Sequence, residues 1–430
     1  MRSVAQQLGV PSEILVIALC LLSSFPLAII YNCIPKTNPA TRHWFSILTT
    51  SLMVVIMFDV WALMHLLVPT LVIYGLVFAK GSNPLVPVSV FVGVIVHLSF
   101  VHLQAQYWYA DDPDFVDIST PLMVLAIRLS SFAWSVYDGS RPAKRTFQTW
   151  LNSLDFFFFA TFWTGPAYDY RYYYEYTRNM GPYQKPLPTA MACFKVFLTG
   201  LLLLVLFLVM DARWGAMALF NGPFFTDYTL IQRLAVVQIT GFSVRAKLSA
   251  AWKFSEAAGI LTGLGCNGIT NLVSAFWHGL YPGFYLSFGS GIFVVLAGRM
   301  MRKYLRPHFV GVGSQLQTFK PVYDVLGCIC TVGVLNYLFT SFFVRWAYTS
   351  LKIWAAMYYA GHCAMLAVIV GLWVYGKTLV VRGRPSPPHP HPSTTDIKSK
   401  LNKIAVVVRP HCFAASTGAN AYMANMYAVC

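Results

Sequence analysis

The chain has 430 residues, of which 57% are hydrophobic and only 11% are charged. An ordinary soluble domain is about a quarter charged, so this composition excludes a typical soluble fold. The formal net charge is +16, and basic cytoplasmic loops of a membrane protein explain this excess without a nucleic-acid partner.

Membrane-spanning helices need about 20 mostly apolar residues, and stretches of that kind recur along the chain. We predict about eleven spans, near residues 14–31, 44–79 (with room for two short helices), 85–103, 120–137, 150–165, 191–210, 229–245, 247–266, 269–298, 321–343 and 353–376. The runs are long and continuous, whereas the spans of a β-barrel are short and alternate in polarity. The expected fold class is therefore all-α, a polytopic transmembrane helical bundle forming one membrane domain over residues 1–380.

The C-terminal end differs in composition from the rest. Residues 385–393 read Pro-Ser-Pro-Pro-His-Pro-His-Pro-Ser, a string that forms neither helix nor sheet. We therefore predict a disordered tail containing Pro and His over residues 381–430. Neither these two histidines nor the nine cysteines of the chain follow a metal-ligand pattern, so no metal site is expected.

The most informative segment is 274–288, which reads Ser-Ala-Phe-Trp-His-Gly-Leu-Tyr-Pro-Gly-Phe-Tyr-Leu-Ser-Phe. His278 lies in an apolar run, where burial disfavours the charged imidazole and leaves a base that can take a proton from a hydroxyl. Gly279, Pro282 and Gly283 interrupt regular helix, which at membrane depth is tolerated only against protein or a water-filled cavity. The residues alone leave two readings, a catalytic histidine at an internal cavity and a hydrogen-bonded packing histidine.

Trp277-His278-Gly279 followed by Tyr281-Pro282-Gly283 resembles the signature of the membrane-bound O-acyltransferase family, and the fuller string resembles its lysophospholipid branch. Four further segments share this resemblance. They are Arg128 to Gly139, ending in Tyr-Asp-Gly; Thr164-Gly165-Pro166, followed by Tyr168-Asp-Tyr170; Ser255 to Gly268, ending in a Gly-rich Asn-Gly turn; and Asn336-Tyr-Leu in a later span.

Two residues in the first of these segments also have structural interpretations. Arg128 lies inside an apolar run, so its side chain is expected to face a partner or a cavity. Asp138 either pairs with Arg128 or simply ends the helix at Gly139.

The resemblance implies a lysophospholipid acyltransferase of the endoplasmic reticulum membrane that moves a fatty acyl group from acyl-CoA to the free hydroxyl of a lysophospholipid. His278 would be the catalytic residue, with acyl-CoA as co-substrate and no bound cofactor. The other candidates for the motif or the substrate tunnel are Trp277, Gly279, Tyr281, Pro282, Gly283, Arg128, Asp138, Gly165, Pro166 and Asn336.

The sequence departs from the family between the Asn-Gly turn and the histidine. Family members carry a long segment there, with a Trp-Asn motif whose Asn is the second catalytic residue, whereas Gly268 is here followed directly by Ile269. Asn267 and Asn271 do not lie in such a motif, so neither takes that role. The alternatives are therefore an active acyltransferase, a member impaired by the missing segment, and an unrelated multispan transporter, which the ordered motifs disfavour.

Overall fold

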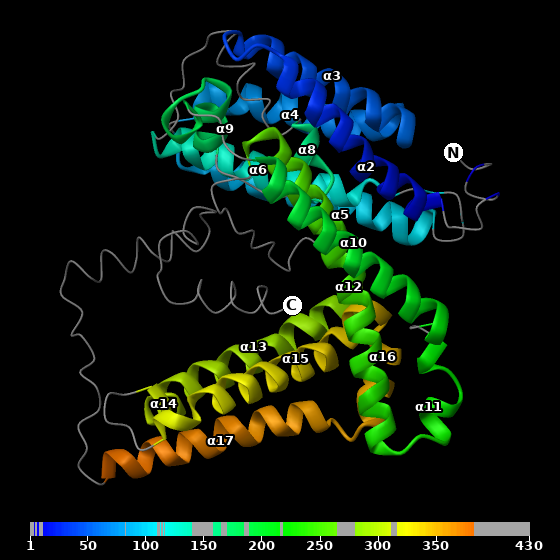
Figure 1. The fold of residues 1–430 in the computed structure, drawn as a ribbon, viewed down its shortest axis with the longest axis vertical. Helices are drawn as coiled ribbons and strands as arrows, with labels where there is room; N and C mark the ends of the chain where they lie inside the picture. Colours follow the sequence, from blue (N-terminus) through cyan, green and yellow to red (C-terminus); the bar gives the residue numbers. More distant parts are fainter. Residues whose placement is uncertain are drawn as a thin grey trace. The chain divides into compact units, whose positions relative to one another are not determined.

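The computed structural model describes the chain from Ser12 to Val381, together with Val4 and Gln7. Within that stretch it leaves out residues 82, 110–111, 113–114, 116, 140–157, 165–169, 185–188, 216–217, 265–279 and 311–315. The described residues form helices and turns and contain no strand, which confirms the all-α fold class. They fall into two compact units (Figure 1).

The first unit contains the described residues up to Leu204 and those of the stretch Leu248–Leu280. Its helices are α2 (Ser12–Cys33), α3 (Pro39–Met57), α4 (Val60–Lys80), α5 (Leu85–Leu103), η1 (Gln104–Trp108), α6 (Ser119–Tyr137), α8 (Phe159–Phe162), α9 (Tyr170–Thr177), η3 (Gly181–Gln184), the first part of α10 (Thr189–Trp214) and the last part of α12 (Leu230–Thr262). Helix α6 packs against both α4 and α5, and 78% of its most apolar stretch is buried, against 33% for each of those two neighbours. Helix α6 is therefore the central helix of this unit.

The second unit contains the stretch Val205–Lys247 and the described residues from Tyr281 onward. Its helices are the remainders of α10 and α12, then η4 (Ala218–Phe220), α11 (Pro223–Thr226), α13 (Pro282–Met300), η7 (Met301–Leu305), α14 (Pro307–Val310), η8 (Gln317–Phe319), α15 (Lys320–Val344), α16 (Ala347–Ala356) and α17 (Ala360–Val381). Helix α13 packs along both α15 and α17, as Figure 1 shows.

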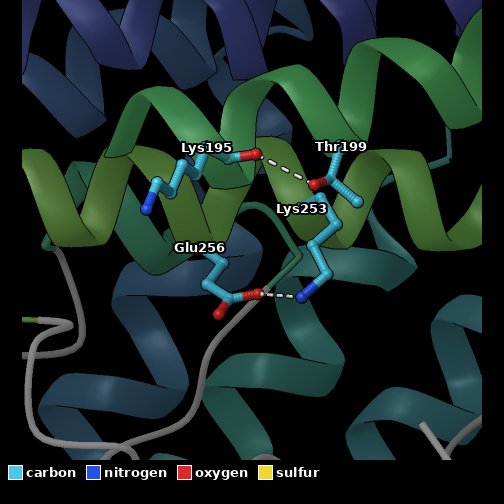
Figure 2. A network of polar contacts seen from close by, with 4 residues as sticks. All are labelled: Lys195, Thr199, Lys253 and Glu256. Carbon is cyan, nitrogen blue, oxygen red and sulfur yellow. Dashed lines mark hydrogen bonds and ion pairs between the residues drawn. The ribbon is translucent and has the colours of Figure 1, made fainter. Parts of the chain in front are cut away.

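Helices α10 and α12 approach closely in the first unit. A Cβ atom added to Gly200 of α10 would lie 3.1 Å from the Cβ atom of Lys253 in α12. Figure 2 shows two polar contacts at this crossing, each between two residues of one helix. In α10, Thr199 donates to the Lys195 carbonyl over 2.9 Å, and in α12, Lys253 pairs with Glu256 over 2.8 Å. Small-residue packing is thus the visible basis of this crossing.

Seven helices of the described part of the chain are long and apolar enough to cross a membrane, or eight if the bent pair α16 and α17 counts as one span. The predicted count of about eleven stays a prediction, because the expected spans near 150–165 and 269–298 lie partly outside the described residues. Five of the predicted runs, 14–31, 85–103, 120–137, 191–210 and 321–343, each correspond to a single helix, and 44–79 corresponds to two.

The expected break between spans 229–245 and 247–266 is wrong. Helix α12 continues from Leu230 to Thr262 without interruption. Arg245 and Lys247, between the two predicted runs, are both good helix formers, and no proline lies nearby to stop the helix.

The run expected near 353–376 is not one continuous helix. Helix α16 ends at Ala356, and α17 begins at Ala360 after a bend of 73°. Tyr358 and Tyr359 form the corner, with φ angles of 53° and 51°. Their amide nitrogens donate to the carbonyls of Ala355 and Trp354, so the left-handed corner satisfies the last carbonyls of α16.

Candidate active site

Of the predicted site residues, His278, Trp277, Gly279, Gly165 and Pro166 lie outside the described residues. Tyr281, Pro282, Gly283 and Asn336 belong to the second unit, while Arg128 and Asp138 belong to the first. The structure therefore shows how the neighbours of the catalytic candidate are held within each unit.

The Tyr-Pro-Gly string after His278 forms the start of α13. Tyr281 has an extended conformation (φ −64°, ψ 129°), and Pro282 takes the first helical position. Proline suits that position because its missing N–H would have no partner in the first turn and its φ angle is already helical. The string thus sets where the chain stops being extended and becomes helix.

Gly283 brings the first turn of α13 against the end of α15. Its amide nitrogen donates to the carbonyl oxygen of Arg345 over 2.7 Å. A Cβ atom on Gly283 would collide with the Ser341 carbonyl oxygen and lie 2.6 Å from that of Arg345. Only glycine permits this backbone approach.

The same corner holds the Tyr281 ring. The guanidinium carbon of Arg345 lies 5.4 Å from the centre of this ring, and the Trp346 ring meets it edge-on at 5.7 Å. Arg345 itself has a φ of +66°, which turns the chain sharply after α15. The residue three positions after His278 is therefore fixed by a cation–π contact and an aromatic contact.

Asn336 is 2% exposed and joins α15 to α12 within the second unit. Its amide nitrogen donates to the Gln238 side-chain oxygen over 2.8 Å, and the Gln238 nitrogen donates to the Gly333 carbonyl over 3.1 Å. A Cβ atom on Gly241 of α12 would lie 2.7 Å from the Cβ atom of Asn336. A small residue facing a hydrogen-bonded amide is the geometry of a helix–helix contact in a membrane protein.

Arg128 is 5% exposed and fixes the short helix α8. Its guanidinium donates to the Thr161 carbonyl over 3.0 Å and to the Thr161 hydroxyl over 2.7 Å. Ser255 of α12 donates to the Ala160 carbonyl over 3.2 Å, and Gly259 of α12 approaches Thr161. Two segments that resemble the family, those of Arg128 and Ser255, therefore meet at α8, which ends two residues before Thr164.

Asp138 ends α6 and does not pair with Arg128. The two residues are ten positions apart on one helix, a rise of about 15 Å, and Arg128 points to Thr161. The Asp138 amide bonds to the Trp134 carbonyl, and Gly139 follows with a φ of +73°. Of the two interpretations offered by the sequence, helix termination is therefore correct.

One polar cluster of the second unit was not anticipated. His362 of α17 lies with Nδ1 2.9 Å from the Tyr337 hydroxyl and Nε2 3.0 Å from the Ser290 hydroxyl. The indole nitrogen of Trp354 donates to the Tyr337 carbonyl over 3.1 Å. A histidine inside the apolar run 353–376 was the available signal, since ionisable residues within membrane helices rarely lack a partner.

The chain is similar to known proteins both in one motif-bearing stretch and over most of its length. The model of the membrane-bound O-acyltransferase family matches residues 267–340, a stretch that includes His278, the start of α13 and Asn336. The chain is 27% identical to a lysophospholipid acyltransferase of Schizosaccharomyces pombe, with 86% of this chain and 88% of the relative covered. It is 26% identical to one of Saccharomyces cerevisiae, with 82% and 73% covered.

A mammalian relative covers the chain to a similar extent. The chain is 22% identical to a membrane-bound glycerophospholipid O-acyltransferase of Mus musculus, with 86% of this chain and 92% of the relative covered. The meeting of two motif segments at α8, the Tyr-Pro-Gly start of α13 and these similarities agree with one another. This multi-pass membrane protein therefore resembles the membrane-bound O-acyltransferase family over residues 267–340 and lysophospholipid acyltransferases over most of its length.

Proposed function

We propose that this chain transfers a fatty acyl group from acyl-CoA to the free hydroxyl of a lysophospholipid, in the membrane of the endoplasmic reticulum. The observation that carries the proposal is the similarity over 86% of the chain to a relative named lysophospholipid acyltransferase. The relatives from Saccharomyces cerevisiae and Mus musculus also act, by their names, on phospholipids.

In this proposal His278 is the general base. A neutral imidazole takes the proton of the acceptor hydroxyl while the hydroxyl oxygen attacks the thioester carbonyl carbon. The carbon–sulfur bond then breaks, the thiolate of coenzyme A leaves, and the proton held by the imidazole passes to it. The products are a diacyl phospholipid and free coenzyme A, so the histidine ends the cycle neutral.

In this scheme the described residues position the segments next to the reacting groups. Gly283 and Tyr281 fix the start of α13 immediately after the His278 segment. Arg128 and Ser255 hold α8, which leads to Gly165-Pro166. Misplacement of a reacting group by about 1 Å can cost about a hundredfold in rate, so contacts of this kind matter to the chemistry.

A second candidate function is a catalytically impaired member of the same family. The alignment with the Schizosaccharomyces pombe relative runs over 461 positions although it covers 86% of a 430-residue chain, so the relative carries residues without a counterpart here. A segment with the second catalytic Asn, absent between Gly268 and Ile269, is our explanation of that excess. Loss of one polar group that stabilises developing charge costs about a hundredfold to a thousandfold in rate.

One experiment separates the two candidates. Membranes from cells expressing the chain are given radiolabelled acyl-CoA and a panel of lysophospholipids, and label in diacyl phospholipid is measured. Incorporation above that of membranes without the chain supports the acyltransferase. Equal incorporation at verified expression supports the impaired member.

A further inference from the structure

The buried face of α3 in the first unit is unexpectedly polar. Arg42, His43, Ser46 and Thr50 all lie on it, and each is at most 1% exposed. Residues four positions apart on a helix lie one above the other, so Arg42 and Ser46 share one surface of α3.

Arg42 is a buried cation. No ion pair between described residues includes it. Its Nε atom donates to the Ile34 carbonyl over 3.4 Å, and its guanidinium carbon lies 4.6 Å from the Tyr31 ring centre and 5.7 Å from that of Tyr176. Burial of a charge is costly unless it is paired, and tyrosine faces compensate only part of that cost.

Two polar atoms on this surface make no hydrogen bond to any described residue. They are Nη1 of Arg42 and the hydroxyl oxygen of Ser46, both fully buried. The guanidinium also lies within interaction range of the Tyr176 hydroxyl. Burial raises the pKa of that hydroxyl, although Arg42 opposes the shift, so Tyr176 stays protonated and supplies no neutralising charge.

The position of this surface suits a phosphate at the level of lipid headgroups. Arg42 lies in the first turn of α3, just after a loop whose Lys36 is exposed, and Trp44 is 40% exposed beside it. Lys and Trp at a helix end are typical of the membrane–water interface.

Tyr176, which contacts Arg42, also holds the end of α12, after which the sequence continues toward His278. The Tyr176 hydroxyl donates to the Thr262 carbonyl over 2.6 Å, and the Asn32 amide donates to the Leu261 carbonyl over 2.9 Å. An anion bound at Arg42 would therefore lie close to the chain that leads into the catalytic segment.

We infer that Arg42 and Ser46 form a phosphate-binding site for a substrate of this protein. The inference rests on the proposed function for its ligand, the phosphodiester of the lysophospholipid. The phosphates of acyl-CoA share the same chemistry, but the exposed Lys36 and Trp44 beside Arg42 are typical of the membrane–water interface and favour the lipid. A phosphate would accept from Arg42 Nη1 and the Ser46 hydroxyl, and it would neutralise the buried cation.

The test is ligand-dependent thermal unfolding of the full chain in a maltoside detergent, which carries no phosphate. The probes are lysophosphatidylcholine, a monoacylglycerol with the same acyl chain, and coenzyme A. The variants are Arg42→Gln and Ser46→Ala, with Ser24→Ala as the matched control. Ser24 of α2 is equally buried, but its hydroxyl donates to the Cys20 carbonyl over 3.0 Å.

We expect lysophosphatidylcholine to raise the Tm of the wild type and of Ser24→Ala, while monoacylglycerol does not. The dissociation constant should rise on the order of tenfold in Ser46→Ala and at least as much in Arg42→Gln. Ser46→Ala should unfold no earlier than the wild type without ligand, because its hydroxyl bonds to no described residue. The Ser46→Ala variant therefore still tests the site if Arg42→Gln fails to fold.

Loss of the coenzyme A shift alone in both variants would keep the phosphate site and assign it to the co-substrate. Equal shifts in all variants, no wild-type shift with either phosphate probe, or an equal shift with monoacylglycerol would overturn the inference. Binding is read without turnover, so the proposed function fails separately. A wild type that transfers no acyl label but needs Ser46 to bind lysophosphatidylcholine contradicts only the proposed function.

Discussion

The amide nitrogen of Gly283 donates to the carbonyl oxygen of Arg345 over 2.7 Å. The first turn of α13 therefore packs directly against the residue that follows α15. Any side chain on Gly283 would occupy the space of the Ser341 and Arg345 carbonyls. This contact ties the segment after His278 to a rigid part of the second unit.

Gly283→Ala should therefore destabilise the protein by about 1–3 kcal/mol through overpacking and reduce acyl transfer. Gly289→Ala in the same helix is the control, because no atom lies within 4 Å of its added Cβ. Replacing a mid-helix glycine by alanine should stabilise by up to about 1 kcal/mol. Thermal unfolding in detergent measures both, and equal Tm values for the two variants would contradict the packing argument.

Thr161→Val tests the anchoring of α8. Valine keeps the shape of threonine but removes the hydroxyl that accepts from Arg128 over 2.7 Å. A hydrogen bond to a charged group contributes about 1.5–3 kcal/mol, and the expected loss of unfolding free energy is of that order. Thr199→Val, which removes an exposed hydroxyl of α10, should stay within about 0.5 kcal/mol of the wild type. Similar losses in the two variants would show that Arg128 does not depend on Thr161.

Asn336→Ala separates packing from catalysis at α15. The amide donates to Gln238 over 2.8 Å, and such bonds between membrane helices contribute about 0.6 kcal/mol on average. We expect a small loss of stability and acyl transfer that falls only in proportion to folded protein. A fall of a hundredfold at equal folded amount would assign Asn336 a direct part in the reaction.

His278→Ala should lower acyl transfer by about a hundredfold or more, because general-base catalysis contributes about 10²–10⁴ in rate. His308→Ala is the control, since His308 is an exposed histidine of the second unit that bonds to the Tyr375 hydroxyl. Label incorporation into phospholipid at matched expression is the measurement. Unchanged activity in His278→Ala would remove this residue from the mechanism.

The junction between Gly268 and Ile269 carries the last prediction. We expect the natural transcript to encode further residues there, including a Trp-Asn motif, because both flanks resemble the family. Transcript sequencing and a search for peptides across the junction are the measurements. If the only product joins Gly268 directly to Ile269, the short form is real and should have little acyl transfer. A short form that is fully active would show that the two-residue mechanism does not hold here.

The sequence predicted elements whose cause is local. Helix α5 occupies Leu85–Leu103, the same bounds as the predicted run, because a turn around Asn83 and Pro84 precedes a continuous apolar stretch. The end of α6 at Gly139 was also readable, since glycine takes the left-handed conformation without strain. No such signal marks Tyr358 and Tyr359, because tyrosine seldom has a positive φ.

The site depended on contacts that no local pattern contains. The bonds from Arg128 to Thr161 and from Ser255 to Ala160 join residues that are 33 and 95 positions apart. In the sequence, an arginine near a helix start cannot be distinguished from an ordinary surface charge. Only the burial of Arg42 in the fold distinguishes it. The order of the motifs predicted which segments matter. That the Arg128 and Ser255 segments meet at α8 depends on packing.

His362 has one further consequence for the second unit. A neutral imidazole carries one proton, so one ring nitrogen donates and the other accepts. The Tyr337 and Ser290 hydroxyls, 2.9 Å and 3.0 Å from the two nitrogens, must therefore play opposite parts. Moving the ring proton from one nitrogen to the other reverses both bonds together and leaves every heavy atom in place. A single ring proton on α17 therefore sets which way the hydroxyl of Ser290 on α13 and that of Tyr337 on α15 point their own protons.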